Sequence, residues 1–84
     1  MNKVYCVKET WIDFGCAHIE KYYFNDKGAA LSMAALLKSK FLERYKEDNL
    51  CVEDYGECGF TIFDRSFDID EYNYSVEIEE AMEV

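Results

Sequence analysis

The chain has 84 residues, half of them apolar, with seven Tyr, six Phe and one Trp. This composition is typical of one small globular domain with a thin core, and it excludes a disordered acidic tail. No run of about 18 apolar residues is present, and charge interrupts the first nine positions before a signal-peptide core could form. We therefore expect a chain that neither spans a membrane nor is secreted, located in the cytoplasm with its four cysteines reduced.

The net charge of −9 is distributed unevenly along the chain. Residues 1–46 carry eight Lys/Arg and five Asp/Glu, whereas residues 47–84 carry thirteen Asp/Glu and a single Arg65. The C-terminal half should therefore repel nucleic acid and attract a basic partner, with fast and salt-dependent association.

The N-terminal half predicts a hairpin followed by a helix. Residues 3–24 contain β-branched and aromatic runs on both sides of turn material at 13–15, which is typical of a β-hairpin. Residues 26–46 are rich in helix formers, with Asn25 and Asp26 as candidates for the N-cap. One face of this helix carries apolar residues at helical spacing, namely Ala30, Met33, Ala34, Leu37, Phe41 and Tyr45.

The C-terminal half predicts two further strands. Residues 47–59 are acidic and contain two glycines, so we expect a structured loop with a short extended piece at 50–52. Residues 60–67 and 72–80 have strand character, and the second run alternates apolar and polar positions. The predicted fold class is α+β: one domain over residues 1–84, in the order β-β-α-β-β, with an antiparallel sheet packed on one long helix.

A cysteine and histidine set suggests a metal site. Cys16 and His18 lie two residues apart on the second predicted strand, so both side chains leave the same face. Cys51 and Cys58 bracket the loop that contains Gly56. Together these four residues make a Cys₃His set of the kind that holds structural Zn²⁺, which would add folding free energy to a small domain.

Cys6 is excluded from this set by hairpin geometry. It should pair with about Tyr23, some seven residues from Cys16 along the ladder and on the order of 23 Å away, so we assign it to the core. Two alternatives to zinc remain open. All four cysteines could be buried or incidental thiols, or Cys51 and Cys58 could form a disulfide.

No common catalytic pattern is present, and we expect no enzymatic activity. A Cys16–His18 pair on one strand lacks the orientation and third group that a nucleophilic pair needs. No Gly-rich phosphate loop or nucleotide motif occurs, and the carboxylates near Asp68 lack the spacing of a calcium loop.

The whole chain, with its Cys/His set and acidic C-terminal strands, resembles the small phage-encoded anti-CRISPR proteins, especially those that act on type II effectors. The resemblance includes the opening residues 3–11 (KVYCVKETW) and the entry to the helix at 22–27 (YYFNDK). It implies a phage protein, in the cytosol of a host bacterium, that binds an RNA-guided nuclease stoichiometrically and prevents loading or cleavage of target DNA.

Such nucleases hold nucleic acid in a positively charged channel, for which an acidic DNA mimic can compete. The carboxylates expected to contact this partner are Asp64, Asp68, Asp70, Glu71, Glu77, Glu79 and Glu80, with Zn²⁺ serving structure only. The alternative function is a zinc-stabilised structural or regulatory adaptor without a nuclease target. It could be a homodimer that uses Leu31, Leu42 and the edge strand.

Overall fold

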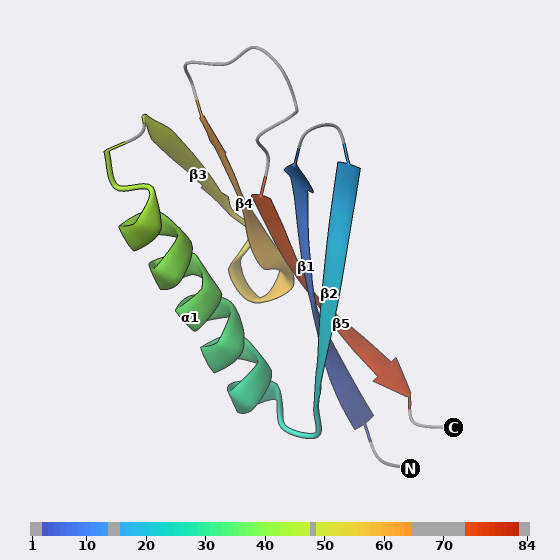
Figure 1. The fold of residues 1–84 in the computed structure, drawn as a ribbon. Coiled ribbons are helices and arrows are strands. Elements are labelled where there is room, and N and C mark those ends of the chain that lie inside the picture. The colour runs from blue at the N-terminus through green and yellow to red at the C-terminus, as the bar shows by residue number, and fades with distance from the viewer. Residues whose placement is uncertain (1–2, 14–15, 48, 65–73, 83–84) are drawn as a thin grey trace.

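Five antiparallel strands and one helix build the fold in the computed structural model, which describes residues 3–13, 16–47, 49–64 and 74–82 (Figure 1). The helix lies on one face of the sheet, and the strands follow the order β2-β1-β5-β4-β3. The elements in chain order are β1 (Lys3–Asp13), β2 (Cys16–Phe24), α1 (Lys27–Arg44), β3 (Leu50–Asp54), the short 3₁₀ helix η1 (Gly56–Cys58), β4 (Gly59–Asp64) and β5 (Tyr74–Met82).

The predicted α+β fold and the order β-β-α-β-β are confirmed, and β3 adds a fifth strand where we expected only a short extended piece. The hairpin also has the expected register, because Asp13 pairs with Cys16 and Cys6 pairs with Tyr23. Strand β4 begins at Gly59 and strand β5 at Tyr74. The predicted extension of these strands into residues 65–73 lies outside the described residues.

Helix α1 begins and ends within two residues of its predicted bounds. The Asp26 carboxylate accepts a hydrogen bond from the Gly28 backbone N–H at 3.2 Å, which satisfies one of the unpaired donors of the first turn. Arg44 is the last helical residue, and the Tyr45 N–H donates to the Phe41 carbonyl at 3.1 Å. Tyr45 therefore lies just beyond the helix, where its exposed ring contacts that of Phe41 at a centroid distance of 4.8 Å.

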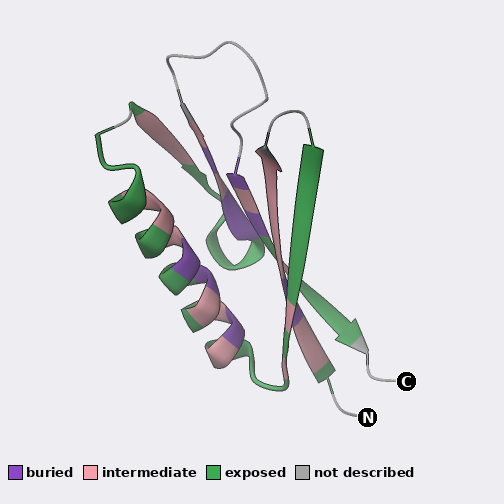
Figure 2. Cartoon of the chain, viewed as in Figure 1, coloured by how far each residue is buried: buried purple, intermediate pink, exposed green. Residues whose placement is uncertain are grey.

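The core lies between α1 and one face of the sheet (Figure 2). Side chains alternate between the two faces of a strand, so Val7, Val76 and Ile62 all point towards the helix and are fully buried. They meet three buried residues on the inner side of α1: Ala30, Ala34 and Leu37. Among the described elements, none packs on the opposite face of the sheet, and β2 is green along most of its length in Figure 2.

Cys6 is buried, as predicted, but it is not part of this core. It neighbours Val7 on β1 and therefore points to the face of the sheet opposite the helix. Its direct neighbours across the ladder there are Tyr23 and Glu79.

The junction between η1 and β4 requires a glycine. Gly59 has a φ of +123°, and a Cβ atom at this position would lie 1.9 Å from the Val76 carbonyl oxygen. The close approach of β4 to β5 therefore depends on the absence of a side chain at residue 59.

Candidate protein-binding surface

The four predicted zinc ligands do not come together. Cys16 and His18 lie on β2 and Cys51 lies on β3, which are the two opposite edges of the sheet. Four strand spacings separate these edges, or about 19 Å. Cys58 lies in η1, four residues beyond the end of β3, and its thiol is free, so the alternative disulfide with Cys51 is absent.

Within the described parts of the chain, no three His, Cys, Asp or Glu side chains are close enough to hold one metal ion. The predicted site required Cys51 to lie in a loop that was free to approach the hairpin. Residues 50–54 are instead fixed as an edge strand by pairing with β4. Zinc binding stays a prediction without a site among these residues, and His18 instead stacks on Trp11 at 5.2 Å.

The predicted acidic contacts fall into three groups. Asp68, Asp70 and Glu71 lie outside the described residues, and Asp64 is the last residue of β4. The three others are exposed on β5, where alternation divides them between the two faces of the sheet. Glu77 and Glu79 point to the uncovered face, and Glu80 points to the helix side.

The structure extends this acidic group to neighbouring elements. Strand β3, η1 and β5 carry six exposed carboxylates and no Lys or Arg, and we call them the acidic set: Glu53, Asp54, Glu57, Glu77, Glu79 and Glu80. Of these, Glu53, Asp54 and Glu57 were not among the predicted contacts, although their position in the acidic half of the sequence was a signal for them.

Lysines from the N-terminal half pair with four members of the acidic set. Lys3 contacts Glu80, Lys8 contacts Glu77, Lys27 contacts Glu57 and Lys38 contacts Asp54, with N–O distances between 2.5 and 3.2 Å. The charge asymmetry of the sequence is therefore partly balanced in space, because β5 pairs with β1 and η1 lies near the start of α1. Such exposed pairs contribute little to stability, because water and salt screen them.

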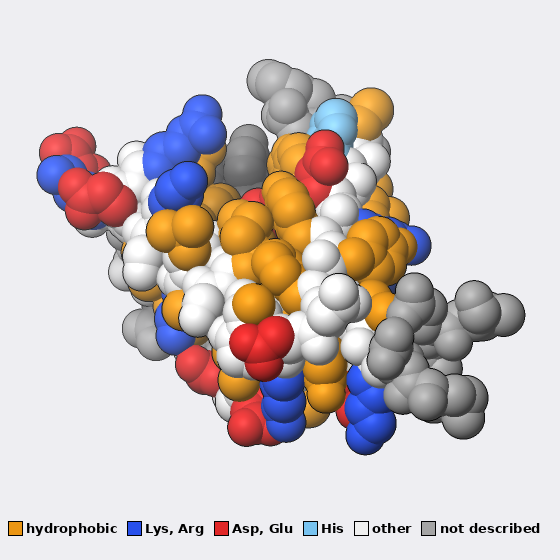
Figure 3. All heavy atoms as spheres, turned by 90° about the horizontal axis from the view of Figure 1, so that it is seen from below, with side chains coloured by type: hydrophobic (Ala, Val, Ile, Leu, Met, Phe, Trp, Pro, Cys, Tyr) orange, Lys and Arg blue, Asp and Glu red, His pale blue; other side chains and the backbone are white. Residues whose placement is uncertain are grey.

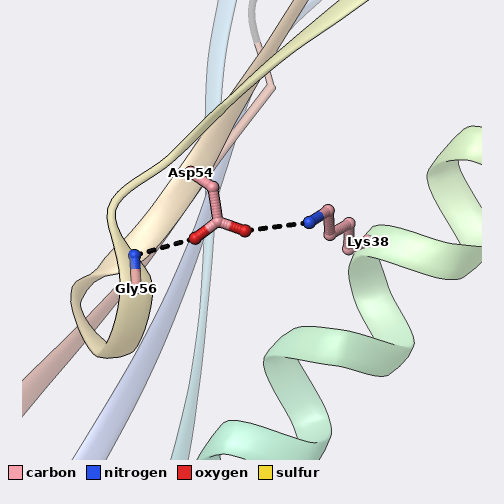
Figure 4. A network of polar contacts seen from close by, with 3 residues as sticks. All are labelled: Lys38, Asp54 and Gly56. Atoms are coloured by element: carbon pink, nitrogen blue, oxygen red, sulfur yellow. Dashed lines mark hydrogen bonds and ion pairs between the residues drawn. The ribbon is translucent and has the colours of Figure 1, made fainter.

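Asp54 of the acidic set uses both of its carboxylate oxygens as acceptors (Figure 4). One oxygen accepts from Lys38 Nζ at 3.0 Å, and the other accepts from the Gly56 backbone N–H at 2.8 Å. The hydrogen bond from Lys38, the Gly56 N–H and the charge of Lys38 hold the pKa of the Asp54 carboxyl below its usual value. This contact joins α1 to the turn between β3 and β4. It borders a shallow pocket of about 140 Å³ whose apolar lining includes Leu31, Phe60 and Ile78.

A second polar cluster, not predicted from the sequence, lies on the helix side of the sheet. The Glu9 carboxylate accepts hydrogen bonds from the hydroxyls of Tyr22, at 3.3 Å, and Tyr74. Burial, followed by the hydrogen bond and charge of Glu9, raises the pKa of both phenols. The sequence contained a signal for this cluster, because Glu9 lies between Val7 and Trp11 on one face of β1. A carboxylate on an otherwise apolar strand face needs hydrogen-bond partners.

Both oxygens of Glu9 are occupied by donors from its own chain, which gives the cluster a structural role: it joins the β1–β2 hairpin to β5. Half-buried apolar side chains border the core nearby, among them Tyr22, Phe24 and Met33. Seen from below the view of Figure 1, apolar side chains gather in the middle of the surface, and charged groups lie around its margin (Figure 3).

Comparison with known proteins found no matching family model, no similar curated protein and no similar solved structure. Among the residues that the structure describes, no helix is both long enough and apolar enough to cross a membrane.

Proposed function

We propose that this chain acts without catalysis, by binding a protein that presents a basic surface normally occupied by nucleic acid. The single observation that supports this proposal most is the acidic set, in which six exposed carboxylates lie on three elements that carry no cation of their own. The members of the acidic set on the uncovered face of the sheet, Glu53, Glu77 and Glu79, would meet a basic partner through complementary charge, which favours fast and specific association.

The lysines that pair with the acidic set do not argue against such contacts. Each pair is exposed and screened, so an incoming guanidinium can replace a lysine at little cost. Arginine also bonds a carboxylate through two parallel N–H groups, a geometry that the lysine ammonium does not offer.

A type II RNA-guided nuclease is the partner we propose to test first. The reasons are the resemblance of the sequence to small phage-encoded inhibitors and the positively charged channel in which these nucleases hold their heteroduplex. Binding there would prevent loading or cleavage of target DNA.

The experiment is a DNA-cleavage assay in which the chain is titrated into a type II nuclease with its guide RNA. We expect cleavage to fall in proportion to the added chain and to stop near a fixed molar ratio, since the chain is bound and not turned over. A matched pair of variants locates the contact. Glu77→Gln with Glu79→Gln changes the acidic set, whereas Glu43→Gln with Glu47→Gln removes equal charge near the end of α1.

The first double variant should inhibit more weakly than the parent, and the second should inhibit as well as the parent. Equally weakened inhibition by both variants would show that net charge alone matters, whereas parent-like inhibition by both would exclude Glu77 and Glu79 as contacts. No inhibition by the parent at any ratio would refute the nuclease as partner.

A further inference from the structure

The two edges of the sheet differ in a way that points to a second binding surface. Strand β3 forms one edge; it has only five residues and ends in two carboxylates. A short edge strand and charged side chains on it both protect against unwanted strand pairing. Strand β2 forms the other edge with nine residues and contains no proline. Two large apolar side chains of β2 are exposed on the uncovered face: Ile19 at 57% and Tyr23 at 63%.

An edge strand of this length offers backbone N–H and C=O groups to an added strand. From the structure we infer that the occupant is a second copy of this chain, whose β2 pairs antiparallel with the first around Ile19. A two-fold axis perpendicular to the sheet relates such strands and keeps both helices on the same side. Even-numbered residues then lie opposite even-numbered ones and odd opposite odd. The axis must therefore lie midway between the two copies of one residue of β2.

The charges of the hairpin select that residue. Lys8 lies opposite Lys21, and Glu9 lies opposite Glu20, so two neighbouring rows of the hairpin each carry a pair of like charges. An axis at Lys21 would place four lysines in one row across the dimer, and an axis at Glu20 would place four glutamates in one row. Like charges directly opposite each other are destabilising.

An axis at Ile19 avoids both conflicts. The central row becomes Thr10, Ile19 and their two equivalents in the partner, and it is uncharged. On the helix side, His18 then lies opposite Glu20 of the partner subunit, and the same pair forms twice by symmetry. Seven residues of each β2 overlap in this register, from Cys16 to Tyr22. Moving the axis to His18 would shorten the overlap to five.

This interface differs from the homodimer expected from the sequence in one respect. Leu31 and Leu42 are half-buried, Leu42 packs against the core, and the interface inferred here does not use them. The edge strand alone carries the proposal. The acidic set lies on β3, η1 and β5, away from the outer margin of β2, so the dimer and the proposed function can each fail without the other.

The test uses disulfide trapping in a chain with Cys16→Ser and Cys58→Ser, which removes the exposed thiols. With the axis at Ile19, the Cα atoms of residue 19 in the two copies lie about 4.5 to 5.5 Å apart, within the range that a disulfide bridges. The two copies of residue 21 are offset by four residues along the strand, or about 13 Å. Mild oxidation should therefore convert Ile19→Cys to a covalent dimer and leave Lys21→Cys monomeric.

Sedimentation provides the second measurement. The parent should sediment as two chains at high concentration, and Ile19→Lys should sediment as one. Leu36→Lys should behave like the parent, because Leu36 is also exposed, at 48%, but lies on α1 outside the interface. Trapping of Lys21→Cys in preference to Ile19→Cys would overturn the register. A parent that remains monomeric, together with no trapping at residue 19, would overturn the dimer.

Discussion

Replacing Tyr74 by Phe tests the cluster that joins the hairpin to the last strand. Tyr74 is 5% exposed, its ring stacks on Phe41 at a centroid distance of 4.2 Å, and its hydroxyl donates to Glu9. Phenylalanine keeps the ring contacts and removes only this donor. A hydrogen bond to a charged acceptor contributes about 1.5 to 3 kcal/mol, which corresponds to a melting temperature lower by about 6 to 24 °C for a domain of this size.

The assay is thermal and urea unfolding of the parent and of two variants. Tyr55→Phe is the matched control, because the Tyr55 hydroxyl also donates to a carboxylate, that of Glu53 at 2.8 Å, but the residue is 54% exposed. Water can replace that bond, so we expect almost no change in stability. Equal losses in the two variants would refute the claim that the Glu9–Tyr74 contact stabilises the fold.

Three further predictions concern the backbone, pH and metal. Gly59→Ala should lower the free energy of unfolding by at least about 1 to 3 kcal/mol, the cost of a strained backbone, and should separate β4 from β5. Gly56→Ala should lower it less, because no atom lies within 4 Å of a Cβ at residue 56. Urea unfolding measures both changes. Asp54→Asn should lower the melting temperature at neutral pH. Because the folded state lowers the pKa of Asp54, its contribution is present above the usual carboxyl pKa and is lost as pH falls through the folded value, so parent and variant should converge in acid. Cys16 and Cys51 should not bind one zinc ion together, which is tested by the zinc content of the two serine variants in elemental analysis. If Cys16→Ser and Cys51→Ser each removed one bound zinc, the separation of the sheet edges would be contradicted.

The sequence was most informative where structure is local. Alternation and turn residues located the hairpin to the correct register, and helical spacing with Asp26 as N-cap located α1. These signals depend on neighbours within a few residues, which a single sequence displays.

The candidate site was harder to predict because it depends on long-range pairing. The sequence does not reveal that β5 inserts between β1 and β4, and this insertion brings Lys3 and Lys8 next to glutamates more than 60 residues later. The same insertion places Tyr74 beside Glu9. It also places the strands that carry Cys16 and Cys51 at opposite edges of the sheet. Residues whose spacing in the sequence is typical of zinc ligands are therefore far apart in the structure.

The affinity of the chain for a type II nuclease, measured as a function of salt, decides whether the acidic set binds this partner. We expect the parent to bind and its affinity to weaken as salt rises, since the contacts are exposed charges. The variant with Glu77→Gln and Glu79→Gln should bind more weakly by about 0.4 to 2 kcal/mol, or roughly 2- to 30-fold. An affinity that changes neither with salt nor with these substitutions, or no binding at all, would refute the acidic set as the contact.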